Sequence, residues 1–169
     1  MRNSVEQRLG MWIKRAEQAM ISAKTKALRP LGLTVPQYAA LLMLHERPRV
    51  SGAELARLCL VTPQTMSTVL ANLEEKKLLQ RSAHPIHSHV LETTLTPLGR
   101  ELLGRADRVA LAVEKRLADA FRADERDLFK KLLSRSIEAL VEDPPKKLSR
   151  RVPRKRTQKH PPDRTVIPS

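Results

Sequence analysis

The sequence is poor in aromatic residues and in glycine. Only four of its 169 residues are aromatic (Trp12, Tyr38, Phe121 and Phe129), whereas leucine occurs 26 times. A core of this composition is expected to consist of leucine-rich helix packing, which favours an α-class fold. The five glycines leave little material for tight catalytic turns, and no phosphate-cradling Gly-rich loop, HExxH or nucleophile elbow is present. We therefore predict that the protein is not an enzyme and uses no cofactor.

Cysteine and long apolar runs are also scarce. The single cysteine, Cys59, excludes an intrachain disulfide and fits a reducing compartment. It lies among Leu55, Leu58 and Leu60, where a small buried hydrophobe is a better interpretation than an oxidant sensor. No run of 18 apolar residues occurs, and the N-terminal stretch lacks the apolar core of a signal peptide. These absences predict a cytoplasmic protein with no membrane partner.

Acidic residues are outnumbered, with 18 Asp and Glu against 32 Lys and Arg, a formal net charge of +14 and a pI near 10.7. This balance predicts an anionic partner, nucleic acid before an acidic membrane surface. Residues 143–169 hold nine Lys and Arg against two Asp, so half of the excess lies there. That segment is proline-rich and has few apolar residues, so we expect a disordered tail after one folded domain over residues 1–142. The tail could follow the DNA backbone or merely improve solubility.

Helix starts are marked clearly. Three pairs have capping-box spacing, in which a hydroxyl and a side chain three residues later satisfy backbone donors, and two Thr-Pro pairs add further starts: Ser4 with Gln7, Thr34 with Gln37, Ser51 with Glu54, Thr62-Pro63 and Thr96-Pro97. With apolar periodicity they predict six helices at about 5–28, 35–46, 52–60, 63–77, 97–121 and 125–141. In the fifth helix, the stripe expected to be buried is Leu98, Leu102, Ala106, Val109, Val113 and Leu117.

Between the fourth and fifth helices the periodicity changes. The stretches "LLQRSA" and "VLETTLT" flank "HPIHSH" and predict a two-stranded hairpin. Two helices joined by a short turn and followed by a hairpin have the order of a winged helix-turn-helix. We therefore predict a mainly α fold with a small β-hairpin wing.

The helix predicted at 63–77 has two contrasting faces. Met66, Val69, Leu70 and Leu73 recur at helical spacing and should be buried. The opposite face is polar and suits the DNA major groove, although a solvated face of a helical bundle would look similar. We assign base readout to this face. The helix starts and the wing are assigned contacts with the DNA backbone that position the protein. The readout residues are Gln64, Thr65, Ser67, Thr68 and Asn72, and the positioning residues are Ser51, Thr62, Arg81, His84, His87, Ser88 and His89.

These stretches resemble the MarR (multiple antibiotic resistance regulator) family of bacterial transcription regulators. The matching pieces are "LTVPQYAALLML", "ELARLCLVTPQTMSTVL", "LEEKKLLQR" and "LTPLGRELL", in order and at matching spacing over about residues 5–141. The resemblance implies a DNA-binding part at about 34–96 and a homodimer held by the helices at about 5–28 and 97–141. It also implies a double-stranded, pseudo-palindromic operator and repression released by a ligand.

The resemblance further implies a ligand pocket between the first, second and fifth helices, near the dimer interface. Trp12, Arg15, Tyr38 and Leu42 are candidate lining residues, a mixture suited to a small aromatic or phenolic effector. Ordinary core and interface packing is the alternative for each of them.

The sequence departs from the family pattern at four places. Leu60 and Lys77 stand where the family often has glycine, so the turn and the helix end use less permissive residues. Thr68 replaces a common arginine of the recognition helix. The acidic and Arg-rich wing tip is replaced by His84-Pro85-Ile86-His87-Ser88-His89.

The wing histidines leave three interpretations open. They could contact phosphate, more strongly when protonated, or bind zinc through His84, His87 and His89, which lack a nearby carboxylate or thiolate other than Glu92. A metal-sensing switch is therefore one alternative to a sequence-specific regulator. The other is a low-specificity architectural DNA-binding protein that relies on its basic tail.

Overall fold

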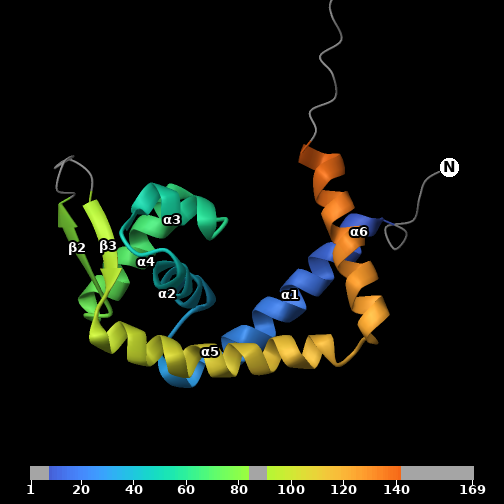
Figure 1. Cartoon of the computed structure of the whole chain (residues 1–169), viewed down its shortest axis with the longest axis horizontal. Coiled ribbons are helices and arrows are strands. Elements are labelled where there is room, and N and C mark those ends of the chain that lie inside the picture. The colour runs from blue at the N-terminus through green and yellow to red at the C-terminus, as the bar shows by residue number, and fades with distance from the viewer. Residues whose placement is uncertain (1–7, 84–90, 142–169) are drawn as a thin grey trace, which may run out of the picture. The chain divides into compact units, whose positions relative to one another are not determined.

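The computed structural model describes residues 8–83 and 91–141 (Figure 1). The chain divides into two compact units, Met1–Arg126 and Asp127–Ser169, and each is described by itself. The described elements are α1 (Leu9–Leu28), the 3-10 helix η2 (Arg29–Leu31), α2 (Val35–Glu46), β1 (Val50–Ser51), α3 (Gly52–Leu58), α4 (Pro63–Glu75), β2 (Leu79–Ala83), β3 (Leu91–Leu95), α5 (Pro97–Ala118) and α6 (Ala123–Val141). The predicted mainly α fold, with six α-helices over the described residues and a hairpin wing, is confirmed.

Side-chain caps fix the starts of α2, α3, α4 and α5. Thr34 Oγ1 accepts from the Gln37 amide at 3.3 Å, and Gln37 Oε1 accepts from the Thr34 amide at 3.1 Å, which completes the predicted capping box. Three further hydroxyls accept from the amide three residues later: Ser51 for α3 (3.2 Å), Thr62 for α4 (3.1 Å) and Thr96 for α5 (3.0 Å). The Ser4–Gln7 pair lies outside the described residues.

Three helix ends share one backbone motif. Gly32, which caps η2, and Leu60 and Lys77, which follow the caps of α3 and α4, adopt a left-handed conformation with φ of 66°, 55° and 57°. In each case the next residue donates its amide back across the last turn, as Val61 does to Ala56 O at 3.0 Å and Leu78 to Leu73 O at 2.9 Å. A side chain in this conformation costs about 1 kcal/mol relative to glycine, so the predicted use of less permissive residues at Leu60 and Lys77 is confirmed.

The sheet has three antiparallel strands in the order β1-β3-β2, and the short strand β1 was not predicted. Leu79 pairs with Leu95, and Arg81 pairs with Thr93, which also pairs with Val50 on its other side. Directly opposed residues of antiparallel strands point to the same face. Because Leu79, Leu95, Val50 and Thr93 are all buried, this row of pairs marks the face of the sheet that packs on the helices.

The core collects leucines from the helices of the first unit, with Leu28, Leu41, Leu44, Leu55 and Leu73 almost fully buried. Helix α5 packs on α1 and α2 (Figure 1). Its buried residues are Gly99, Leu103, Ala106, Ala110 and Val113. The stripe predicted from the sequence is therefore partly wrong, since Leu98 and Leu117 are 52% and 41% exposed. The buried face includes the small residues Gly99 and Ala110, which let neighbouring backbones approach and which the predicted stripe left out.

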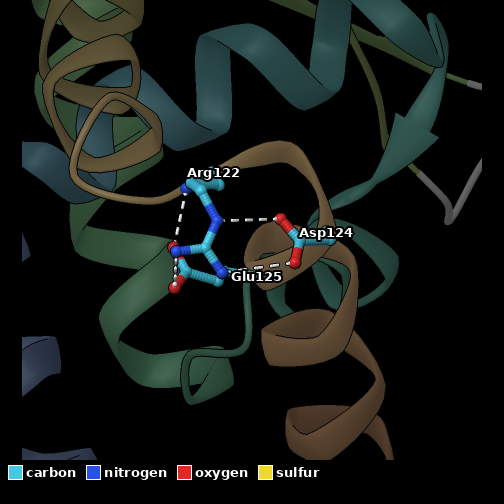
Figure 2. Close-up of polar contacts among 3 residues, drawn as sticks. All are labelled: Arg122, Asp124 and Glu125. Atoms are coloured by element: carbon cyan, nitrogen blue, oxygen red, sulfur yellow. Dashed lines mark hydrogen bonds and ion pairs between the residues drawn. The ribbon is translucent and has the colours of Figure 1, made fainter.

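Helix α6 begins two residues earlier than predicted, and acidic side chains stabilise its first turn. The Arg122 amide donates to Glu125 Oε2 at 2.8 Å, and the Arg122 guanidinium contacts Glu125 at 3.1 Å and Asp124 at 3.4 Å (Figure 2). Negative charge at a helix N-terminus is favourable because the backbone dipole is positive there. Beyond this turn, α6 buries none of its described residues within the single chain.

Among the helices of residues 8–83 and 91–141, none combines the length and the apolar composition that crossing a membrane requires.

Gly99 has no room for a side chain, which gives a test of the packing at the start of α5. A Cβ there would lie 1.9 Å from the backbone oxygen of Leu78, whereas a Cβ at Gly104 of the same helix would have no neighbour within 4 Å. We expect Gly99→Ala to lower the free energy of unfolding by about 3 kcal/mol or more, the upper range for overpacking. Gly104→Ala should raise it by about 0.5–1 kcal/mol. Urea unfolding measures both, and equal effects would contradict the close approach.

Candidate nucleic-acid interface

Helix α4 separates apolar and polar residues onto opposite faces. Met66, Val69, Leu70 and Leu73 are buried, as the spacing predicted. The exposed polar side chains of the same helix are Gln64, Thr65, Ser67, Thr68, Asn72 and Glu75. All five residues assigned to base readout therefore lie on the exposed face of one helix. This helix begins with the N-cap Thr62 followed by Pro63.

Hydrogen bonds within α4 distinguish these five residues. The Thr65 hydroxyl lies 2.8 Å from the Thr62 hydroxyl, and the Thr68 hydroxyl donates to Gln64 O at 3.3 Å. Both threonines thus have local partners, and a bonded hydroxyl leaves the methyl group as the more available contact. Within the described residues, Gln64, Ser67 and Asn72 make no side-chain hydrogen bond, which leaves their polar atoms open to a ligand.

The N-terminal end of α4 is suited to an anion. Thr62 and Pro63 are both exposed, and the first turn contains no acidic residue. Exposed backbone amides and the positive end of the helix dipole favour negative charge at such a position. A phosphate group of a nucleic acid is the ligand that this end would accept.

Arg81 has a partner within the protein. Its Nε lies 2.8 Å from Glu74 Oε2, and a second guanidinium nitrogen contacts the same oxygen. The hydrogen bond from Arg81 holds the pKa of the Glu74 carboxyl below its usual value. Ser51 is half-buried, and its hydroxyl caps α3.

The predicted wing-tip contacts His84, His87, Ser88 and His89 lie outside the described residues. Within residues 8–83 and 91–141, no group of three or more His, Cys, Asp or Glu side chains is placed to hold a metal ion.

The four predicted pocket residues do not come together in one chain. Tyr38 is buried and Leu42 is half-buried on α2. Trp12 and Arg15 are exposed on α1, with the Arg15 guanidinium 5.3 Å from the centre of the Trp12 ring. Trp12 lies sixteen residues before Leu28, the α1 residue that joins Tyr38 in the core, a separation of about 24 Å along a helix.

A polar cluster that the sequence did not reveal joins α1, α2 and α5. The Tyr38 hydroxyl donates to Asp107 Oδ1 at 2.7 Å, and Lys24 of α1 forms an ion pair with Glu114 of α5. Burial, followed by the hydrogen bond and charge of Asp107, raises the pKa of the Tyr38 phenol far above its usual value. The partners are 69 residues apart in the sequence, so no local pattern could have indicated the contact.

Cys59 is half-buried beside the core, and burial raises the pKa of its thiol. A raised thiol pKa lowers the fraction of reactive thiolate, which fits the structural interpretation of this residue.

The raised pKa of Tyr38 predicts a pH dependence of stability. Above pH ~10 the unfolded chain releases the phenolic proton while the native protein retains it, so the stabilisation by this group is present below pH ~10 and is lost as pH rises further. Tyr38 is the only tyrosine in the chain. Tyrosinate absorbance should therefore appear near pH 10 in urea but not in the native protein, and Tyr38→Phe should reduce the alkaline loss of stability. Native absorbance that titrates near pH 10 would contradict the buried hydrogen bond.

Comparisons with known proteins agree with this geometry. A family model described as the MarR family matches residues 31–87. The HTH-type transcriptional repressor Rv2887 of Mycobacterium tuberculosis is 39% identical over 127 residues, which cover 75% of this chain and 91% of the relative.

Solved structures show the same likeness. The structure of the M. tuberculosis MarR family protein Rv2887 in complex with p-aminosalicylic acid matches with a TM-score of 0.62 and 38% identity, over 76% of this chain and 97% of that one. The transcriptional repressor CouR bound to a 23-mer DNA duplex matches with a TM-score of 0.74 and 25% identity, over 81% and 97%. The winged unit has the capped helices and the buried core that the sequence predicted, and a relative is 39% identical over most of its length. The chain therefore belongs to the MarR family.

Proposed function

We propose that the protein is a sequence-specific, DNA-binding transcriptional repressor that acts as a homodimer and is released by a small aromatic ligand. In this proposal the protein is a regulator and not an enzyme, and it acts in the cytoplasm. The observation that carries the proposal is the two-faced helix α4, which buries four apolar residues and presents Gln64, Ser67 and Asn72 without partners among the described residues. Amide and hydroxyl side chains in the major groove can distinguish bases by hydrogen bonding.

The relatives support a double-stranded DNA partner. Rv2887 has been solved in complex with DNA, at 38% identity to this chain, and CouR bound to a DNA duplex. In this chain the proposed base-reading residues are Gln64, Thr65, Ser67, Thr68 and Asn72. Proposed contacts with the DNA backbone come from Ser51 and Thr62, and at the wing tip from His84, His87, Ser88 and His89.

The terminal helices support a dimer. Helix α1 exposes Leu9, Trp12 and Ile13, and α6 exposes Leu132, Ile137 and Leu140. Apolar side chains at helical spacing on helices that bury little within one chain are typical of a surface that packs against another protein. We place the whole MarR-type domain in residues 1–142 and regard residues 143–169 as a basic extension.

The ligand class follows from the relatives and from composition. Rv2887 has been solved with salicylic acid and with p-aminosalicylic acid. A small aromatic acid is therefore the proposed effector. Its candidate contacts are Trp12 and Arg15 of α1 and Tyr38 and Leu42 of α2. The two pairs would come together only through a second chain or a bound ligand.

A footprint on the DNA upstream of the gene tests the proposal. Two bound subunits should protect two half-sites of a pseudo-palindrome whose centres are about one helical turn, 10–10.5 base pairs, apart. Added salicylate should abolish the protection. Uniform protection without a preferred sequence would instead indicate a low-specificity DNA-binding protein.

Two variants test the assignment of base readout. Gln64→Ala and Asn72→Ala should each weaken operator binding by about 1–3 kcal/mol, because each removes an amide that can bond a base edge. Binding to unrelated DNA should hardly change, since that affinity depends on phosphate contacts. Gln18→Ala, which removes an exposed amide of α1, is the matched control. Equal losses on operator and unrelated DNA, measured by fluorescence anisotropy, would refute base readout by these residues.

A further inference from the structure

One ion pair connects the recognition helix to the wing. Glu74 lies in the last turn of α4 and Arg81 in the middle of β2, and the Nε–Oε2 distance is 2.8 Å with a second contact from the same guanidinium. Between them the chain turns through the left-handed residue Lys77. The pair therefore closes a short loop of backbone across the corner where the recognition helix becomes the wing.

The strand register places Arg81 on the side of the sheet that faces the helices. Its directly opposed residue in β3 is Thr93, which is 1% exposed and points into the core. Arg81 consequently occupies an inward-facing position of β2, in line with buried Leu79 two residues before it. Beyond Leu79 every residue of β2 is exposed, Arg81 included. The Arg81 guanidinium therefore meets Glu74 at the surface and not in the core.

The position of Glu74 is unfavourable unless it has a partner. The C-terminal end of a helix is the negative end of its dipole, and α4 has no basic residue in its last turn. The hydrogen bond from Arg81 lowers the pKa of the Glu74 carboxyl and so stabilises its charged form. A negative charge close to a DNA-binding surface also repels phosphate. Pairing with Arg81 offsets both effects.

We propose that Glu74 and Arg81 form a clamp that fixes the wing relative to the recognition helix, so that Glu74, an acidic residue, is a positioning residue for DNA binding. The clamp rests on the proposed function, because it concerns how two DNA-contacting elements are held together. It assigns Arg81 a different task from the phosphate contact expected from the sequence. The guanidinium holds α4 and β2 together and does not contact DNA.

A double-mutant cycle on the full chain distinguishes the two tasks. If the clamp operates, Glu74→Gln and Arg81→Gln each weaken operator binding about tenfold, a size typical of coupling between contacting side chains, and the double variant is no weaker than the weaker single one. The matched control is Glu75→Gln, which removes the same charge from the exposed neighbouring residue. It should leave the affinity unchanged or raise it, since it only reduces repulsion of phosphate.

The salt dependence supplies a second readout. A clamp variant loses no phosphate contact, so Arg81→Gln should leave the slope of log K against log salt unchanged. A phosphate contact would instead reduce the slope by about 0.9, and Glu74→Gln would then strengthen binding. Either of these results would overturn the clamp. Exchanging the charges with Glu74→Arg and Arg81→Glu should recover affinity relative to either reversal alone, and failure to recover also contradicts it.

The failure of the clamp can be separated from the failure of the proposed function. If the wild-type chain binds all DNA sequences equally, the proposed function fails. Hydrogen exchange of the backbone amides in the free protein then tests the clamp independently of DNA binding. Amides of β2 should exchange faster in Glu74→Gln than in Glu75→Gln, and equal exchange would refute the clamp whatever DNA is bound.

Discussion

The carbonyl oxygen of Leu78 is the point on which the winged unit depends. It accepts from the Thr96 amide at 3.1 Å, while the Thr96 hydroxyl donates to Lys77 O at 2.8 Å and caps the Gly99 amide. Recognition helix, hairpin base and α5 therefore meet within a few residues of backbone. Gly99 allows this approach because it has no Cβ, and the end of α4 is turned into it by the left-handed Lys77.

This junction fixes where α4 ends and where the wing begins, but it acts at the base of the hairpin only. Further along β2, the Glu74–Arg81 pair adds a second attachment between the strand and the helix. An exposed ion pair contributes little to folding stability, about 0–1 kcal/mol, since water competes for both partners. Its proposed value lies in orientation, because it joins α4 to β2 at a second point beyond the base of the hairpin.

Local patterns in the sequence were sufficient for most of the fold. A helix start is marked locally by a Ser or Thr that is followed by Pro or, three residues later, by Glu or Gln. The side chain of this Ser or Thr caps a backbone amide without reference to distant residues, so the predicted starts at Thr34, Ser51, Thr62 and Thr96 agree with the structure. The apolar spacing of α4 predicted its buried face, and therefore its polar one. The readout residues themselves stay predictions, since their exposure is necessary for DNA contact but does not demonstrate it.

Two of the features that were missed depend on partners remote in sequence. Strand β1 is two residues long and exists only because β3 pairs with it, and Tyr38 meets Asp107 from another helix. The buried face of α5 differs from the predicted stripe because it includes Gly99 and Ala110, which hydrophobic periodicity weighs least. Arg81 shows a different limit, since its partner Glu74 is only seven residues away in the sequence. Its charge predicted a contact with the DNA backbone, which stays a prediction, whereas the structure pairs its guanidinium with Glu74 at the surface. The pair could be recognised only once the fold had placed the end of α4 beside β2.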